Sequence, residues 1–177
     1  MVQFIASYFF PGDETYYLGD WFTRVEGGAQ QLWTYPYLPG QRYLDKPVYV
    51  LTASTTFSAP EGLASFLQHH EKAVIVGEKT IGGTHPVVMV RVHSNFAIAV
   101  PVSMPVYPAG LPTSPLNRPV YPDRAPDTTG TPVVPDIEAP ANQALKTAHI
   151  AALTRLIETD PERAGELQPV IEQLKTN

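Results

Sequence analysis

The stretch between Pro47 and His85 constrains the fold more than any other part of the chain. It contains two short apolar runs rich in β-branched residues, Val48–Leu51 and Ala73–Val76, separated by a helical pattern. Two strands joined through a helix form a right-handed βαβ unit with parallel strands. The stretch therefore predicts an α/β fold with a buried sheet. It also places Ser58 at a strand-to-helix corner, where backbone amides converge.

The segments on either side of this unit predict further elements. A helix is expected over residues 1–10, and a β-hairpin around the Gly27-Gly28 turn. Residues 86–102 hold two apolar runs that predict an antiparallel pair of strands, and we expect both faces of this pair to be buried. Eleven prolines between residues 101 and 140 exclude a regular helix or a central strand there. An edge strand is expected at 133–137.

The last third of the chain predicts helices. Residues 141–158 carry one apolar stripe, formed by Leu145, Ala148, Ala152, Leu153 and Leu156. Asp160-Pro161 is typical of a helix start, and Pro169 is expected to divide the tail into two short helices. We therefore divide the chain into a core over residues 1–157 and a helical tail over 158–177. Because apolar residues recur at helical spacing from Val2 onward, we expect the chain to be part of a longer protein.

The composition excludes several classes of function. The chain has 177 residues, 44% of them hydrophobic, which predicts a globular domain with a core. A formal net charge of −5 without any basic cluster argues against a nucleic-acid partner. No cysteine is present, and the five histidines lack metal-ligand spacing, so neither a metal nor another cofactor is expected. No apolar run approaches the roughly 20 residues that a membrane-spanning helix needs.

Two readings of Ser58 remain open from the residues alone. Ser58-x-x-Glu61 has the spacing of a capping box, in which both side chains satisfy helix amides. The same hydroxyl at a helix N-terminus could act as a nucleophile, with free amides holding an oxyanion. Glu61 could still cap if the hydroxyl points outward.

Other residues near this corner also have two readings. The Gly82-Gly83 pair is either a tight turn or an edge that binds substrate. His85 is a candidate general base or a polar residue at the start of a strand. Lys79 is expected to be an exposed turn residue, and Asp136 to cap backbone amides. His69, His70 and His149 are expected to be structural.

The ordered set of motifs resembles the core of the S41 serine peptidases, in the branch related to the interphotoreceptor retinoid-binding protein and the tricorn core. The similarity covers roughly residues 1–157. It rests on the sequences Thr56-Phe57-Ser58-Ala59-Pro60-Glu61, Val76-Gly77-Glu78-Lys79-Thr80-Ile81-Gly82-Gly83-Thr84-His85-Pro86 and Val134-Pro135-Asp136-Ile137.

The resemblance implies a ClpP/crotonase-like α/β spiral and a set of roles. Ser58 matches the nucleophile, and the backbone amide of Ala59 would be one oxyanion donor. Substrate would lie extended along Gly82, Gly83 and Thr84. The general base and a glycine-rich turn that completes the oxyanion hole are expected upstream of Met1.

The sequence departs from the family at three positions. The Ser/Lys branch has its base as a lysine in a Gly-Lys-Gly turn, where this chain has Gly83. The tricorn-like branch has a glutamate near Thr129, and Asp127 is the candidate orienting acid in its place. Pro60 replaces a small residue and biases the backbone of Ala59.

The leading hypothesis is a serine peptidase that cleaves peptides or proteins through an acyl-enzyme. The 177-residue chain alone is expected to be inactive, and His85 is the candidate base within it. One alternative is a non-catalytic module of the same fold that binds an apolar ligand or peptide. Another is a domain that only mediates assembly. A homo-oligomer is possible, and the family's tendency suggests a periplasmic or extracellular setting.

Overall fold

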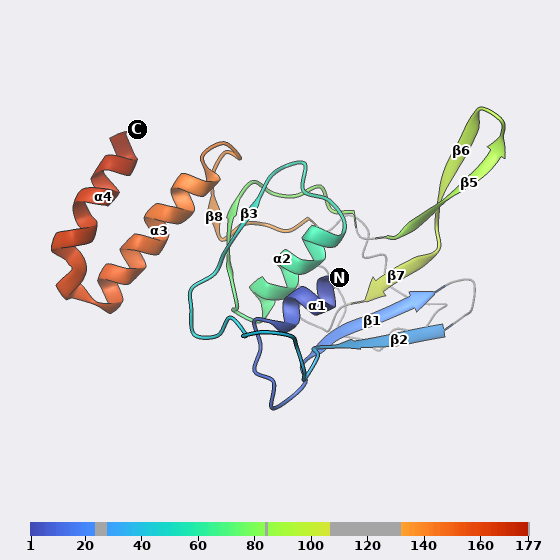
Figure 1. The fold of residues 1–177 in the computed structure, drawn as a ribbon. Helices are drawn as coiled ribbons and strands as arrows, with labels where there is room; N and C mark the ends of the chain where they lie inside the picture. The colour runs from blue at the N-terminus through green and yellow to red at the C-terminus, as the bar shows by residue number, and fades with distance from the viewer. Residues whose placement is uncertain (24–27, 84, 107–131, 177) are drawn as a thin grey trace.

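The structure is a computed structural model that describes residues 1–23, 28–83, 85–106 and 132–176. Figure 1 shows a central α/β body with a two-stranded arm on one side and a pair of helices on the other. The elements in chain order are α1 (Val2–Ser7), β1 (Tyr17–Thr23), β2 (Gly28–Trp33), β3 (Tyr49–Thr52), α2 (Ala59–His69), β4 (Val74–Gly77), β5 (Val87–His93), β6 (Phe96–Pro101), β7 (Ser103–Val106), β8 (Ile137–Glu138), α3 (Ala144–Thr159), a 3₁₀ turn at Pro161–Arg163 and α4 (Ala164–Thr176). None of the helices in these ranges is long and apolar enough to cross a membrane.

A parallel sheet with strand order β3-β4-β8 forms the centre of the body. Tyr49 pairs with Val74 in β4, and Val76 pairs with Ile137 in β8, so the predicted βαβ unit is confirmed. The predicted edge strand is also present, although it begins only at Ile137. The sheet is less covered than the apolar run of β3 suggested, because Leu51 is 42% exposed.

The two faces of this sheet are covered by different helices. Alternate side chains of a strand point to opposite faces. Ile75 packs with Ala64 of α2 and Val133 on one face, while Val76 packs with Ala148 of α3 on the other. Ile75 and Val76 are both fully buried. The resulting three layers, α2, sheet and α3, explain why the β4 run is apolar at every position.

A second, antiparallel sheet has the strand order β2-β1-β7. β1 and β2 form the hairpin that the sequence predicts around Gly27-Gly28, with Trp21 opposite Gln30. β7 includes a proline, which an edge strand tolerates because one row of its amides needs no partner in the sheet. α1 and α2 meet beside this sheet, where Phe10 and Phe66 share a cluster with Leu18.

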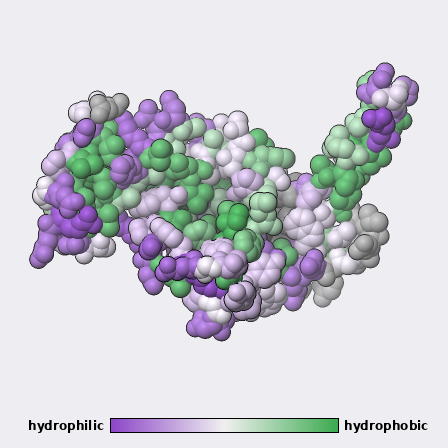
Figure 2. Space-filling view, in the orientation of Figure 1, coloured by the Kyte–Doolittle hydropathy of each residue, from purple (hydrophilic) through white to green (hydrophobic). Residues whose placement is uncertain are grey.

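β5 and β6 form an arm that extends from the body, and the expectation that both its faces are buried is wrong. The pair is antiparallel as predicted, but every residue of β5 is exposed. Figure 2 shows the apolar surface of the arm standing clear of the body. Its most exposed large apolar side chains are Met89 at 65% and Phe96 at 68%. The sequence cannot distinguish a buried apolar hairpin from an exposed one, because both have the same residues.

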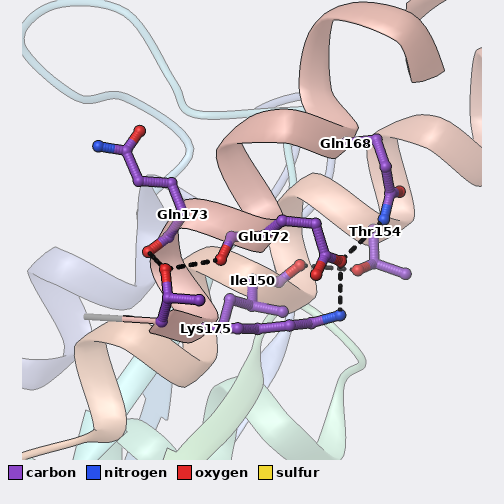
Figure 3. A network of polar contacts seen from close by, with 7 residues as sticks. Ile150, Thr154, Gln168, Glu172, Gln173 and Lys175 are labelled. Atoms are coloured by element: carbon purple, nitrogen blue, oxygen red, sulfur yellow. Dashed lines mark hydrogen bonds and ion pairs between the residues drawn. The ribbon is translucent and has the colours of Figure 1, made fainter.

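α3 and α4 pack against each other through Leu153, Leu167 and Ile171. Pro169 lies within α4, so the prediction that it divides the tail into two helices is wrong. It is the sixth residue of α4, so the helix continues through it although its missing N–H removes one backbone hydrogen bond. Leu145, assigned to the apolar stripe of α3, is 70% exposed. Figure 3 shows polar contacts within these two helices, including the ion pair between Lys175 and Glu172. The charged atoms of this pair are 3.0 Å apart.

Candidate active site

Ser58 lies immediately before α2, at the corner between the parallel strand β3 and the helix. Its backbone has φ 65° and ψ −123°, a conformation that residues other than glycine rarely adopt. Such strain costs on the order of 1–3 kcal/mol and persists only where surrounding contacts enforce it. The corner that the sequence predicts is therefore present in a sharply bent, strained form.

The predicted capping box is present, and Glu61 makes its shortest hydrogen bond. The carboxylate of Glu61 accepts the N–H of Ser58 at 2.6 Å. The N–H of Glu61 donates to the backbone carbonyl of Ser58 at 2.9 Å, and the Ser58 side chain faces the same N–H in the capping box. Glu61 thus fixes the bend from inside.

Glu61 connects the Ser58 corner to the loop that follows β4. Its side chain is fully buried, and besides Ser58 it accepts three more hydrogen bonds. The donors are Thr80 Oγ1 at 2.5 Å, the N–H of Gly82 at 2.6 Å and the N–H of Gly83 at 3.0 Å. Four donors saturate the two oxygens of a carboxylate. Sequence reasoning found only the cap, because nothing in the sequence links Glu61 to glycines 21 and 22 residues away.

The Gly82-Gly83 pair wraps this carboxylate. Two successive amides that point at one anion form a backbone nest, and the positive φ of Gly82 (89°) allows it. Both amides are therefore directed inward. A substrate strand along this edge would have to use the carbonyl oxygens of the pair rather than its N–H groups.

Gly83 is also restricted by the residue before Ser58. A Cβ built on Gly83 would lie 1.8 Å from Cε2 of Phe57, inside the aromatic ring. The position where the Ser/Lys branch has its lysine is thus filled by the ring of Phe57. A side chain longer than hydrogen at this position requires Phe57 to move.

Ser58 and Ala59 line a mostly apolar cavity of about 320 Å³ between α1, β1 and α2. Asp20 is the acidic residue among the lining side chains, and Pro86 closes another side. Among the described residues, the N–H of Ala59 has no hydrogen-bond partner. Because Pro60 has no N–H and Glu61 donates to Ser58, the Ala59 amide is the free donor at this helix end.

The other predicted site residues make no described contact with Ser58 or lie outside the described residues. His85 precedes Pro86, and its buried Nε2 has no partner among the described residues. The described contacts include no hydrogen bond between His85 and Ser58. Asp127, Thr129 and Thr84 lie outside the described residues. Lys79 is exposed, as expected.

Asp136 and Glu78 join the strands around the site. Asp136 accepts the N–H of Ile75 at 2.6 Å and so holds β4 beside the return of the chain before β8. Glu78, which sequence reasoning passed over, accepts the N–H of Ser54 at 2.8 Å and that of Ala141 at 3.1 Å. The bond from the Ser54 amide favours the charged form and lowers the pKa of Glu78.

Comparison with known proteins shows the family and the fold that this chain shares. The model of peptidase family S41 matches residues 5–124. A Bacteroides fragilis NCTC 9343 protein, described provisionally as an S41 protease, is 25% identical at a TM-score of 0.55, over 82% of this chain and 35% of that one. The photosystem II D1 C-terminal processing protease is 21% identical at a TM-score of 0.53, over 79% and 31%. A lipoprotein from Streptococcus agalactiae is 15% identical at a TM-score of 0.52, over 88% and 49%.

These likenesses have two consequences. The mixed α/β fold with parallel and antiparallel sheets is the fold of these structures, as the sequence predicts. The chain spans about a third of the length of the first two structures, and the branch within the family stays a prediction. Since the family model covers most of the chain, the protein belongs to peptidase family S41.

Proposed function

We propose that Ser58 is the nucleophile of a serine peptidase that cleaves peptide bonds through an acyl-enzyme. The observation that carries the proposal is the backbone of Ser58, which is strained at φ 65° at the N-terminus of α2. A buried carboxylate, Glu61, holds this strained corner in place. Strain of this kind clusters at catalytic sites, because it presents a side chain that relaxed backbone would not.

The proposed reaction is an acyl transfer in two halves. Oγ of Ser58 attacks the peptide carbonyl carbon and gives its proton to a general base. The Ala59 N–H, free of other partners among the described residues, donates to the oxyanion that forms. The tetrahedral intermediate expels the amine, which takes the proton from the base. Water then attacks the acyl-enzyme by the same route and releases the carboxylic acid and Ser58.

The base is proposed to be a histidine, with His85 as the candidate within this chain. Its Nε2 is buried without a described partner, and the next residue lines the cavity that holds Ser58. A lysine at the Gly83 position is excluded as the base, because the residue there is glycine and Phe57 fills the space. Asp127 as the orienting acid remains a proposal that rests on the resemblance alone.

The nucleophile is tested with a fluorophosphonate probe on the full-length protein. Labelling that Ser58→Ala abolishes and Ser65→Ala preserves is expected. Ser65 is a suitable control because it lies in the same helix but is buried in its interior. Absence of labelling, combined with tight binding of an apolar dye, would instead favour the non-catalytic module.

The base is tested by comparing two histidines near the ends of β5. His85→Ala is expected to reduce kcat/KM at least about 100-fold. His93→Ala, at the exposed far end of the arm, should leave kcat/KM unchanged. An unchanged kcat/KM in His85→Ala would assign the base to another histidine of the full-length protein.

A further inference from the structure

Phe57 has an unusual combination of position and exposure. It immediately precedes Ser58, and its ring occupies the space above Gly83, where a Cβ would lie 1.8 Å from Cε2. The side chain is nevertheless 53% exposed. One part of the ring therefore packs on the Gly83 backbone, and the rest faces solvent beside the strained corner.

The loop joined to the Phe57 segment carries a second exposed apolar side chain, and backbone hydrogen bonds hold the two loops together. Ile81, on the other loop, is 55% exposed. Its N–H donates to the carbonyl of Thr56 at 3.2 Å, which joins the two loops next to Phe57. Glu61 joins them a second time, through the N–H groups of Ser58 and Gly83. Phe57, Ile81 and Gly83 together form what we call the aromatic shelf.

We propose that Phe57 is a specificity-determining residue, whose ring selects peptides with a large apolar side chain next to the cleaved bond. The inference deepens the peptidase function proposed above and rests on it. A phenylalanine ring buries about 150–250 Å² when it is fully covered, so a half-exposed ring keeps substantial apolar area available for a ligand. Because Gly83 has no side chain, the ring packs directly on its backbone, which holds the exposed part of the ring in place.

Burial of apolar area predicts which peptide is preferred and by what factor. Covering a leucine side chain with apolar surface stabilises a complex more than covering an alanine does, and a shelf that covers only part of the side chain supplies part of this gain. Because about 1.4 kcal/mol is a factor of ten, a tenfold preference for leucine over alanine is expected at the position that meets the shelf. A ring that only supported Gly83 would affect all peptides equally.

The test uses the full-length protein and pairs of peptides that differ only by leucine or alanine at one position flanking the cleaved bond. In Phe57→Ala the leucine preference, which is the ratio of kcat/KM for the leucine and alanine peptides, should fall about tenfold. Phe57→Leu should keep part of the preference. Phe96→Ala, which removes an exposed ring from the arm, should keep all of it. An equal loss for both peptides in Phe57→Ala would overturn the proposal.

A binding measurement keeps the shelf testable if the protein cleaves no peptide. Fluorescence anisotropy of labelled peptides is measured on the Ser58→Ala variant with and without Phe57→Ala. A leucine preference that disappears with the ring supports the shelf even where the peptidase function fails. Equal affinities for the leucine and alanine peptides in the Ser58→Ala background would overturn the shelf alone.

Discussion

At the scale of single residues, Glu61 determines the geometry of the site. It is a fully buried carboxylate whose four described partners are all neutral donors: three backbone amides and one hydroxyl. Burying a charge is costly unless every lone pair is satisfied, and here each oxygen accepts two bonds. The strained backbone at Ser58, the nest of Gly82-Gly83 and the support beneath the aromatic shelf all depend on this one side chain.

Replacing Glu61 by glutamine is expected to lower the free energy of unfolding by about 3 kcal/mol. The amide oxygen can accept at most two of the four bonds, and its NH₂ group would face N–H donors. Chemical denaturation measures the loss. Glu78→Gln serves as the matched control, because Glu78 accepts only two backbone amides and is partly exposed. Equal losses in the two variants would contradict the role assigned to Glu61.

His70 gives a prediction about pH. Burial against Phe10 and Phe66 lowers its pKa below the ordinary value of 6.5, and His69 and Lys72 act in the same direction. The unfolded chain therefore takes up this proton first, so stability should fall as pH decreases through about 6.5 and should not change from this source above about pH 7.5. In His70→Phe this component of the decline should disappear. A denaturation series from about pH 8 to pH 5 checks it, and identical slopes in both proteins would refute it.

At the scale of elements, the parallel sheet depends on a close approach at Gly77. This residue ends β4 with φ 137°, and a Cβ on it would lie 2.0 Å from the carbonyl oxygen of Thr52 in β3. The end of the sheet that leads into the Ser58 corner therefore admits no side chain at this position.

Gly77→Ala is expected to destabilise the protein by several kcal/mol or to prevent folding, because the methyl group collides with backbone. Gly165→Ala provides the contrast. Gly165 lies in α4, and a Cβ added to it would have no neighbouring atom within 4 Å, so alanine there should stabilise by about 0.5–1 kcal/mol. Thermal unfolding of the two variants should shift in opposite directions. A stable Gly77→Ala protein would show that β3 and β4 can separate at this end.

The helices and strands could be predicted where the local sequence pattern determines the structure. They could not be predicted where packing between distant segments determines it. The apolar runs at 48–51 and 73–76 and the Gly27-Gly28 turn determined type and pairing correctly. Tertiary packing, which the local pattern does not reveal, determines the exposure of Leu51 and Leu145. It also determines whether α4 continues through Pro169. The same limit applies to the site: Ser58 follows from a corner motif, but the Glu61 bonds to the glycine loop and the ring over Gly83 connect distant parts of the chain.

At the scale of the whole molecule, the arm extends the apolar surface beyond what a monomer normally shows. Its two strands pair only with each other among the described residues, and both faces carry exposed apolar side chains. An uncovered edge with this composition favours association between chains. The 177-residue chain in isolation should therefore associate through the arm as its concentration rises.

The association is tested at Val90 and Ile98, which face each other across the arm. Val90→Lys combined with Ile98→Glu places opposite charges on these neighbours, and so should reduce light scattering without lowering the thermal midpoint of the body. Replacing Leu145, an exposed leucine of α3, by glutamate is the control and should change the scattering little. Undiminished scattering in the arm variant would place the contact elsewhere.

The strained backbone at Ser58 also has a consequence for evolution. Glycine would fit the same φ at less cost, so a lineage with no need for the hydroxyl gains stability by exchanging the serine. If the proposed chemistry holds, the residue at this position should therefore distinguish chains of this fold that use the hydroxyl from those that do not, and this chain has a serine there.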